Sequence, residues 1–385
     1  MNLISMNNLI KKYEDLIGIY YQRKYENYYK KLYKLSKISY RLEIKQRNKL
    51  NKCKITKNEK KDIKKYWKNY TKDFKIYAHK YYVDKNGKKD KKFIPDDIYA
   101  EYIEQYYNNA KLAPAFADKN YFDLYLNGYS MPKTYLHYIN NCFLDDSYKI
   151  ISKDQAINIL SNKESFVVKQ TIGSSGGAGV RVCEKYNTDK IKKLLEYPFS
   201  SNLIFQEKIK QCDLFNKFSS SSINTIRIYT YWYNDEIYVS NSVLRIGVNG
   251  SKTDNASGGG LSFQIDDEDK LILIPRDILG RIDTEFIKNN NINYNNEKLY
   301  FMNNVKSLVK SAAMRLPHFK IISWDIAISE EYKPILIEYN VANTIPDINQ
   351  IGAHPFFGEL TDKILEEVFK GKKQKKEGLN TDQYI

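Results

Sequence analysis

Residues 165–183 read SFVVKQTIGSSGGAGVRVC. Two short runs rich in valine flank a loop crowded with glycine, a pattern that predicts two antiparallel strands joined by a hairpin. Alternation along the first strand places Val167 and Lys169 on the same side. Glycines free backbone N–H groups to contact phosphate oxygens, and a lysine at the strand end adds a fixed positive charge. The stretch therefore predicts a phosphate-binding hairpin, although the glycines by themselves would also fit a mobile hairpin without a ligand.

Other classes of glycine-rich loop do not fit this stretch. A Walker A loop ends in Gly-Lys-Ser/Thr, whereas Gly179 is followed by Val180 and Arg181. A protein kinase carries its lysine after the loop and needs HRD and DFG sequences, which this chain lacks. A dinucleotide-binding loop is followed by a helix, and here GVRVC predicts a strand. These three classes are therefore excluded.

A second stretch, FKIISWDIAISEEYKPILIEYN at residues 319–340, predicts two strands joined by a short turn. Glu338 and Asn340 are two residues apart and face the same way, and Asp325 can lie opposite them on the other strand. Two carboxylates and an amide oxygen suit Mg²⁺, which prefers hard oxygen ligands and usually keeps substrate phosphates as further ligands. The four scattered histidines give little support to a zinc or iron centre. The sequence predicts a Mg²⁺ site here, with a buried acidic residue paired to a lysine as the alternative.

Positive charge is concentrated in the first 92 residues. They hold 28 Lys and Arg against 9 Asp and Glu, whereas the rest of the chain holds 34 against 37. From Leu9 to about Lys80, Leu, Ile and Tyr recur among lysines at three- and four-residue spacing, which predicts long amphipathic helices. The lysines fit a solvated helix face or a surface that attracts anionic lipid or an acidic polymer. No helix-turn-helix, RNP or zinc-finger pattern accompanies them, so nucleic acid is the weakest candidate partner.

The rest of the chain mixes strands and helices. Strands in hairpin pairs between helices predict an α+β fold with antiparallel sheets. A cluster of charge, glycine and proline at residues 84–97 places a boundary near residue 92. We therefore expect three regions: basic and largely helical at 1–92, a smaller α+β unit with the glycine loop at 93–210, and a larger catalytic unit with the Mg²⁺ site and a C-terminal helix at 211–385.

The sequence also bears on cellular location. No stretch approaches the roughly 18 consecutive apolar residues of a membrane span, and the opening MNLISMNNLIKKYEDL lacks the features of a signal peptide. The cysteines form no CxxC pair, which fits a reducing compartment. We expect a cytoplasmic protein, with peripheral contact at the inner face of the membrane as a further option. The cysteines are Cys53, Cys142, Cys183 and Cys212.

The lysine-bearing glycine hairpin, followed by an Asp strand and a Glu-x-Asn strand, resembles the ATP-grasp superfamily. Asp118-Lys119 before a helix, Gly128, and the Pro-x-Thr of residues 132–134 resemble that family's opening segment, and FQEKI resembles its hinge strand. SSINTIRIYTY and NSVLRIGVNGSKTDNASGGGL are most similar to the sugar-transfer-associated, or polysaccharide-biosynthesis, branch. The resemblance covers about residues 115–365. It implies two α+β subdomains whose antiparallel sheets grip ATP.

The resemblance also implies a role for each motif. Lys119 and Lys169 would contact ATP phosphates while the glycine loop closes over the γ-phosphate, and the Asp/Glu/Asn set would hold one or two Mg²⁺ ions. Asp213, just beyond the hinge, would contact ribose or acceptor, although QCDLFNKF departs from the glycine-containing turn common there. Arg227, Arg245 and Lys169 would be catalytic. The other implied ATP contacts are Gly173, Ser174, Ser175, Gly176, Gly177, Ala178, Gln206, Glu207, Lys208 and Ile209, and the implied substrate contacts are Arg227, Arg245, Asn255, Gly258 and Gly259.

The implied activity is that of an ATP-dependent carboxylate–amine ligase with ATP and Mg²⁺ as cofactors. Its carboxylate substrate would be phosphorylated, and an amine would attack the acyl phosphate to form an amide. The branch it resembles implies that an amino acid or small amine is joined to a sugar, such as a uronic acid of a cell-surface polysaccharide. The alternatives are a peptide or amino-acid ligase that uses no sugar, a kinase that stops at a phosphorylated product, and a non-catalytic nucleotide- or glycan-binding protein.

Overall fold

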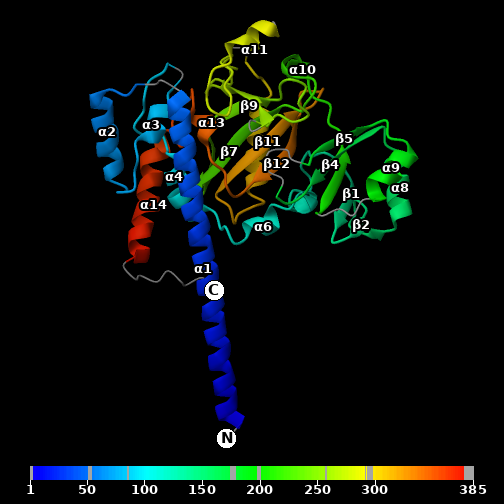
Figure 1. Cartoon of the computed structure of the whole chain (residues 1–385), viewed down its shortest axis with the longest axis horizontal. Coiled ribbons are helices and arrows are strands. Elements are labelled where there is room, and N and C mark those ends of the chain that lie inside the picture. Colours follow the sequence, from blue (N-terminus) through cyan, green and yellow to red (C-terminus); the bar gives the residue numbers. More distant parts are fainter. Residues whose placement is uncertain are drawn as a thin grey trace.

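Two six-stranded antiparallel sheets with a cavity between them organise the chain (Figure 1). The computed structural model describes residues 3–50, 54–84, 86–173, 179–196, 201–255, 258–290, 292 and 298–376. A long N-terminal helix runs beside the second sheet and then projects from the body. The α+β fold with antiparallel sheets that the sequence predicts is confirmed.

The first sheet carries the glycine-loop hairpin. Its strand order is β3-β2-β1-β6-β4-β5, and all neighbours are antiparallel. Phe166 and Val168 of β4 join a core with α8 (Lys153–Ser161) and α9 (Thr188–Glu196), so alternation leaves Val167 and Lys169 for the face toward the cavity. The strands are β1 (Thr134–Ile139), β2 (Cys142–Leu144), β3 (Ile150–Ile151), β4 (Ser165–Gln170), β5 (Arg181–Glu184) and β6 (Leu203–Glu207).

The second sheet has the order β10-β9-β7-β11-β12, and β8 pairs with β7 outside this path. Every residue of the central strand β11 is buried. The strands are β7 (Thr225–Tyr233), β8 (Glu236–Val239), β9 (Ser242–Ile246), β10 (Leu261–Ile265), β11 (Ile321–Ile328) and β12 (Pro334–Asn340). The helices of this part are α10 (Asp213–Phe218), α11 (Thr284–Asn289), α12 (Met302–Ala313), α13 (Asp347–Gln350), the 3₁₀ helix η5 (Gly358–Leu360) and α14 (Thr361–Lys376).

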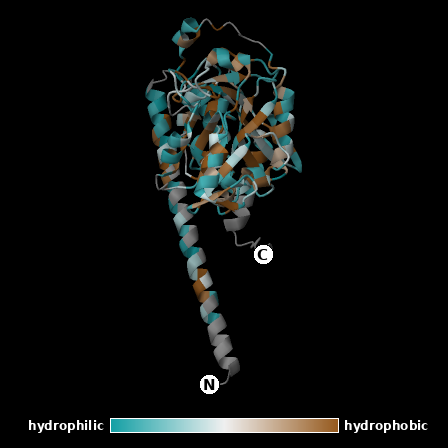
Figure 2. Cartoon of the chain, turned by 90° about the vertical axis from the view of Figure 1, so that its right-hand side faces the viewer, coloured by the Kyte–Doolittle hydropathy of each residue, from teal (hydrophilic) through white to brown (hydrophobic). Residues whose placement is uncertain are grey.

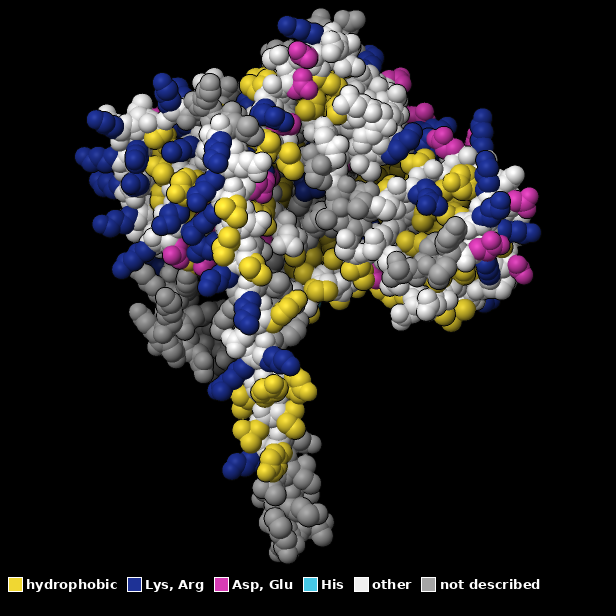
Figure 3. Space-filling view, viewed as in Figure 1, with side chains coloured by type: hydrophobic (Ala, Val, Ile, Leu, Met, Phe, Trp, Pro, Cys, Tyr) yellow, Lys and Arg dark blue, Asp and Glu magenta, His cyan; other side chains and the backbone are white. Residues whose placement is uncertain are grey.

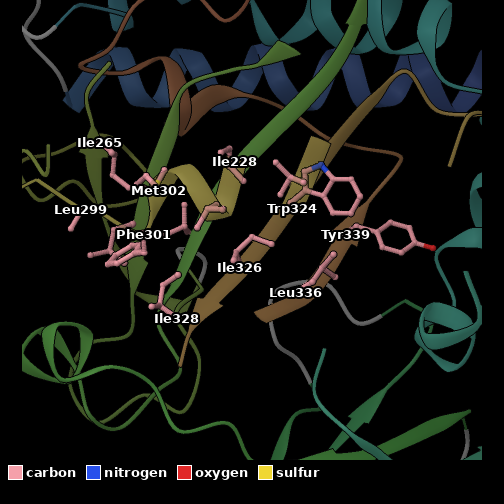
Figure 4. Close-up of a cluster of buried hydrophobic side chains, with 14 of the residues drawn as sticks. Ile228, Ile265, Leu299, Phe301, Met302, Trp324, Ile326, Ile328, Leu336 and Tyr339 are labelled. Atoms are coloured by element: carbon pink, nitrogen blue, oxygen red, sulfur yellow. The ribbon is translucent and has the colours of Figure 1, made fainter. Parts of the chain in front are cut away.

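Strand alternation gives the second sheet two different faces. Trp324, Ile326 and Ile328 of β11 lie in the main hydrophobic core, which includes residues of α12 such as Met302 (Figure 4). Asp325, between two of these positions, faces the other way and lines the cavity. The same strand therefore supplies both the core and a charged group of the site.

A bulge in β12 sets which residues lie opposite Asp325. Asp325 pairs with Glu338, but the next residue, Ile326, pairs with Leu336, so Ile337 is an extra residue in the ladder. Leu336 thus lies in the core whereas Glu338 borders the cavity, although the two are only two residues apart. Bulges beside active sites often re-aim a side chain in this way.

The helices of residues 57–107 are part of the folded body. Trp67, Ile364 and Phe369 belong to one hydrophobic cluster with Tyr229 and Tyr231 of β7. The cluster also contains residues on both sides of position 92, and the expected boundary there stays a prediction. The helices of this part are α1 (Leu3–Leu50), α2 (Lys57–Lys68), α3 (Tyr77–Tyr81), α4 (Asp96–Ile98), the π-helix η1 (Tyr99–Ile103), α5 (Glu104–Tyr107), α6 (Ala113–Phe116), the 3₁₀ helix η2 (Lys119–Tyr121) and α7 (Phe122–Tyr125).

The C-terminal part of α1 is tied to the body by ion pairs. Arg41 pairs with Asp97 at 2.6 Å, and the fully buried Arg47 pairs with Asp347 of α13 at 2.7 Å. The N-terminal part leaves the body, and the hydropathy colouring of Figure 2 shows apolar segments along it. Among the described residues, no helix combines the length and apolar character that a membrane span requires.

The sequence-based assignment of elements fails at three places in the second half. The stretch EIYVSNSVLRIG, residues 236–247, predicts one strand by its alternation, but it forms β8 and β9 with a break at Ser240 and Asn241. The stretch KLILIP, residues 270–275, also predicts a strand, but it forms only isolated bridges. Strand β10 was not expected, because its LSFQI follows three glycines and has little β-branched character.

We expect Trp67→Ala to lower the free energy of unfolding by about 3–5 kcal/mol, because the indole is fully buried between α2 and the body. Urea denaturation followed by circular dichroism measures the change. Lys64→Ala, on the exposed side of the same helix, is the control and should shift it by less than about 0.5 kcal/mol. Equal effects of the two substitutions would show that α2 does not share the core.

Candidate active site

A cavity of about 1120 Å³ lies between the two sheets. Its walls come from β4 and β5 of the first sheet, from residues 207–211 that link the sheets, and from β7, β9, β11 and β12 of the second. Residues 341–343, directly after β12, also line it. The cavity is large enough for a ligand of drug size, and several charged side chains converge on it.

Two arginines and one aspartate form a buried charge cluster on the cavity floor. Arg227 of β7 donates two hydrogen bonds to Asp325 of β11, from Nε to Oδ1 at 2.5 Å and from Nη2 to Oδ2 at 2.9 Å. Arg245 of β9 adds a contact from Nη2 to Asp325 Oδ1 at 3.1 Å. Burial would raise the pKa of Asp325, but Arg227 and Arg245 outweigh it and lower the pKa below its ordinary value. Asp325 is therefore ionised in the folded protein.

Asp254 extends this cluster toward the loop after β9. Its carboxylate accepts a hydrogen bond from the Thr225 hydroxyl and lies 3.3 Å from Arg245 Nη2. Arg245 also donates to Thr225 Oγ1 at 2.9 Å. Burial raises the pKa of Asp254, and Arg245 only partly offsets this. Gly260 keeps this loop close to β9, since a Cβ there would lie 2.7 Å from the Asp254 carbonyl oxygen.

Two lysines face this cluster from the other side of the cavity. Lys119 Nζ lies 3.0 Å from Glu338 Oε1, and Lys169 Nζ donates to Gln206 Oε1 at 3.3 Å. Burial lowers the pKa of Lys169 to about 8; Glu338 opposes this shift and Lys119 adds to it. The site thus presents four cationic side chains, two from each side, around Asp325 and Glu338.

The chemistry of the predicted metal ligands fits Mg²⁺. Asp325 and Glu338 are paired across the β11–β12 ladder, and Asn340 follows on the same strand and lines the cavity. Within the described parts of the chain, no group of three or more His, Cys, Asp or Glu side chains is placed to hold a metal. A metal bound by Asp325, Glu338 and Asn340 would have two carboxylates and one amide oxygen as ligands, a set that leaves positions for phosphate oxygens.

Of the nine other predicted residues that the structure describes, five line the cavity and one adjoins it. Gly173 and Asn255 line it, and Gln206 adjoins it through its bond with Lys169. Asp213 is exposed at the start of α10 and is not part of the lining. The lining also includes Glu207, Lys208 and Ile209; Gly258 and Gly259 are exposed outside it, and Ser174, Ser175, Gly176, Gly177 and Ala178 lie outside the described residues.

Sequence reasoning missed three residues of the site. Thr225 lies two residues before Arg227 on the same strand, so strand alternation predicts that the two side chains lie on one face. Asp254 precedes Asn255, and only the fold shows that it pairs with Arg245. Glu104 of α5 lines the cavity and accepts from the Thr344 backbone N–H at 2.6 Å. No local sequence pattern predicts that Glu104 lies in the site, because its partner Thr344 is 240 residues further along the chain.

We expect Asp325→Ala to destabilise the protein by about 3–5 kcal/mol, because two buried guanidinium groups would lose their counter-charge. The free energy of unfolding in urea measures this without any ligand. Glu331→Ala removes an exposed carboxylate from the turn between the same two strands and should change it by less than about 0.5 kcal/mol. A small effect of Asp325→Ala would mean that the arginines are not held by this carboxylate.

Comparison with solved structures finds matches at low similarity. An N5-carboxyaminoimidazole synthase from Aspergillus clavatus, solved with ADP, is 10% identical over 62% of this chain and 48% of its own, with a TM-score of 0.37. A D-alanine-D-alanine ligase from Coxiella burnetii is 11% identical over 68% and 60%, with a TM-score of 0.38. The ATP-grasp ligase PsnB, solved with a minimal precursor, Mg and ADP, is 14% identical over 68% and 62%, with a TM-score of 0.35. The chain thus spans less than two thirds of each of these proteins.

The family comparison is more specific. No curated protein matches the chain in sequence. The family model described as sugar-transfer-associated ATP-grasp matches residues 98–359, which is more than half of the chain and includes both sheets and the whole charge cluster. The resemblance seen in the sequence motifs is therefore confirmed: the chain belongs to the sugar-transfer-associated ATP-grasp family.

Proposed function

We propose that the protein is an ATP-dependent carboxylate–amine ligase that works through an acyl phosphate. The observation that carries this proposal is the convergence in one cavity of Lys119 and Lys169 from one side and Arg227 and Arg245 from the other. Such an arrangement suits a reaction in which a phosphoryl group passes between two anionic substrates. The cavity supplies positioning and charge, and this chemistry needs no nucleophilic side chain.

The nucleotide is proposed to bind between the sheets. Lys119 and Lys169 would hold phosphate oxygens, and residues 206–209 would contact the base. In the structure as described, Lys169 donates to Gln206 and Lys119 pairs with Glu338. ATP phosphates would compete for both ammonium groups, which frees Glu338 for a metal ion. The proposal that the glycine loop contacts phosphate rests on its sequence alone.

Asp325, Glu338 and Asn340 are proposed to hold Mg²⁺. The ion, when bound, neutralises charge on the phosphates and helps to orient them. Arg227 and Arg245 would share Asp325 with the metal, since an ionised carboxylate has about four lone-pair sites and the two arginines use three of them. Each guanidinium keeps further N–H groups. Those groups would bind the carboxylate substrate and the transferring phosphoryl oxygens.

The proposed reaction has two steps. A carboxylate oxygen of the substrate bonds to the γ-phosphorus of ATP while the bond to the β-phosphate oxygen breaks, which yields ADP and an acyl phosphate. The amine nitrogen then bonds to the acyl carbon, the bond to the phosphate oxygen breaks, and the nitrogen loses a proton. The buried walls of the site exclude water, which would otherwise hydrolyse the acyl phosphate.

The proposed substrates are an amino acid or small amine and a sugar-borne carboxylate, such as a uronic acid of a cell-surface polysaccharide. The family description, sugar-transfer-associated, supports the sugar. A ligase acting on peptides or amino acids alone is the second candidate, and a non-catalytic nucleotide- or glycan-binding protein is the third. The three sequence regions, 1–92, 93–210 and 211–385, remain part of this proposal, as does contact of the basic first region with an anionic surface.

The ligase proposal predicts Mg²⁺-dependent ADP release with a panel that crosses uronic-acid glycans with free amino acids. The product should be one water lighter than the two substrates together, by mass spectrometry. Lys169→Ala and Glu338→Ala should each lower the rate at least a hundredfold, and Lys153→Ala, an exposed lysine of the same sheet region, should not. Release of a stable phosphoester would instead indicate a kinase, and turnover without sugar would indicate a peptide ligase.

The pKa of Lys169 predicts how ATP affinity depends on pH. Its ammonium is charged below about pH 8 and loses its charge as the pH rises through this value. The affinity for MgATP, measured by calorimetry from pH 6.5 to 9.5, should fall above pH 8 by up to about tenfold per unit. Lys169→Arg should remove this dependence, because arginine does not titrate in this range. Identical profiles for the two proteins would exclude Lys169 as a phosphate contact.

A further inference from the structure

Glu104 is a buried carboxylate in the cavity wall to which the reaction above gives no role. It begins α5, is 7% exposed and lines the cavity. Its Oε1 accepts hydrogen bonds from the Thr344 backbone N–H at 2.6 Å and from the Thr344 hydroxyl at 2.7 Å. Within the part of the chain that the structure describes, Glu104 takes part in no ion pair. A buried carboxylate without a cationic partner is costly, so a cationic ligand would stabilise it.

The neighbouring acidic groups of the cavity already have cationic partners. Glu104 and Asp325 are the most buried of the described acidic side chains in the lining, and Asp325 contacts two arginines. Asp254 and Glu338 contact an arginine and a lysine. Lys and Arg side chains also gather on the outer surface over α2 and the adjoining part of α1 (Figure 3). Glu104 therefore offers a cationic substrate a buried carboxylate that is not already paired.

Strand register places this carboxylate close to the proposed phosphoryl-transfer site. In the ladders of β7, β11 and β12, the row that contains Tyr229 and Asn340 follows the row of the charge cluster on the same face. The Tyr229 hydroxyl donates at 2.9 Å to the carbonyl oxygen of Ile345, the residue after Thr344. Residues 341–343 line the cavity between Asn340 and Thr344. A substrate group held by this carboxylate would therefore lie beside the proposed metal ligands.

Several hydrogen bonds fix the position of Glu104. The Asn108 side chain, one helical turn later, donates to the carbonyl oxygens of the first residue of β11 and the first residue after β12, at 2.6 and 2.9 Å. The Tyr99 and Thr344 hydroxyls are hydrogen-bonded at 2.8 Å. The short helix that carries Glu104 is thus tied to the two strands of the proposed metal site. Groups held in this way can position a substrate precisely.

These contacts suit the amine substrate of the proposed ligase. An aliphatic amine is an ammonium ion at neutral pH, so it is attracted by negative charge and must lose a proton before it attacks a carbonyl carbon. We propose that Glu104 binds the ammonium group of the amine substrate and accepts this proton. The inference rests on the proposed ligase function, and it applies equally to a free amino acid and to another small amine.

The proton transfer balances within the two-step reaction. An N–H bond of the ammonium breaks toward the Glu104 carboxylate, and its electron pair stays on nitrogen. That pair forms the bond to the acyl carbon while the bond to the phosphate oxygen breaks, and the departing phosphate takes the second proton from nitrogen. Glu104 returns its proton to water when the amide leaves. Burial raises the pKa of Glu104, although its hydrogen bonds from Thr344 oppose this shift, and a raised pKa makes the carboxylate a stronger base.

Two nucleophiles separate this role from the ligase chemistry. Hydroxylamine is largely uncharged at neutral pH and converts an acyl phosphate to a hydroxamate, so it does not need an ammonium site. Wild type and Glu104→Gln are compared with MgATP, uronic-acid oligosaccharides or amino acids as the carboxylate, and either hydroxylamine or single amino acids as the nucleophile. Mass spectrometry measures hydroxamate and amide. Glutamine keeps an oxygen that can accept from Thr344 and removes the charge.

We expect Glu104→Gln to form hydroxamate within about twofold of the wild-type rate, because phosphorylation of the carboxylate does not use this residue. With an amino acid as nucleophile, its KM for that amino acid should rise at least tenfold, and kcat should fall at least a hundredfold. Glu101→Gln is the matched control. It removes a carboxylate that pairs with Lys37 in the same segment and does not line the cavity, and it should behave as wild type with both nucleophiles.

Failure of the ligase function and failure of the Glu104 role give different results. Wild type that yields neither ADP nor hydroxamate would overturn the ligase function and the Glu104 role with it. Hydroxamate from both proteins with equal amide formation would overturn the Glu104 role alone. Loss of hydroxamate as well as amide in Glu104→Gln would show that Glu104 maintains the fold of the site, and would also overturn its role toward the amine. Urea unfolding of both proteins measures that structural contribution directly.

Discussion

The charge cluster of Arg227, Arg245 and Asp325 is the constraint on which the rest of the site depends. Two guanidinium groups and a carboxylate are held on adjacent strands in a part of the molecule that is nearly closed to solvent. Buried charges are costly unless they are paired and hydrogen-bonded. The ladder meets this requirement directly, since Arg227 lies opposite Asp325 in the register of β7 and β11. The strand register and the charge pairing therefore support each other.

Around this cluster, one face of the second sheet serves two purposes. Towards one end of β7, Thr225 and Arg227 face the cavity, and towards the other end Tyr229 and Tyr231 pack against helices of the N-terminal and C-terminal parts. The opposite face is largely apolar and packs against α12, and the buried Thr230 on it accepts a hydrogen bond from Trp324 Nε1 at 2.9 Å. The helices of residues 57–107 thus close the part of the face that the ligand site leaves uncovered. The last of these helices, α5, contributes Glu104 to the cavity wall.

Charged side chains from both sheets line the cavity. The first sheet supplies Lys169, Glu184 and Glu207, and the second supplies Arg227, Arg245, Asp325 and Glu338. Lys119 bridges the two by pairing with Glu338. An anionic ligand that binds Lys119 competes with Glu338 for its ammonium group, so binding of an anion and release of this carboxylate are linked by geometry. Such a link suits a site that takes an anionic nucleotide together with a divalent cation.

Much of this protein could be predicted from its sequence, because several signals are local. Period-two alternation of apolar residues predicted β4, β7, β11 and β12. The two-residue spacing of Glu338 and Asn340 predicted that both side chains lie on one face of β12. The order of the motifs from Lys119 to Asn340 predicted the family, which the family comparison confirms. Site residues that contact neighbours on the same or an adjacent strand can be predicted from the sequence, because the period of the strand fixes the face on which each side chain lies.

Other features were decided only by the tertiary structure. The bulge at Ile337 breaks the alternation that would put Leu336 beside Glu338, and a bulge depends on the partner strand. Asp254 and Glu104 join the site through contacts with Arg245 and Thr344 that no spacing rule connects. The burial of Trp67 was likewise decided by the tertiary structure, because the basic helix that carries it would be expected to lie on the surface, whereas the body buries its indole. The sequence by itself determined the strands and their chemistry; the fold decided which distant groups share a low-dielectric cavity, because burial and pairing arise only when the whole chain is packed.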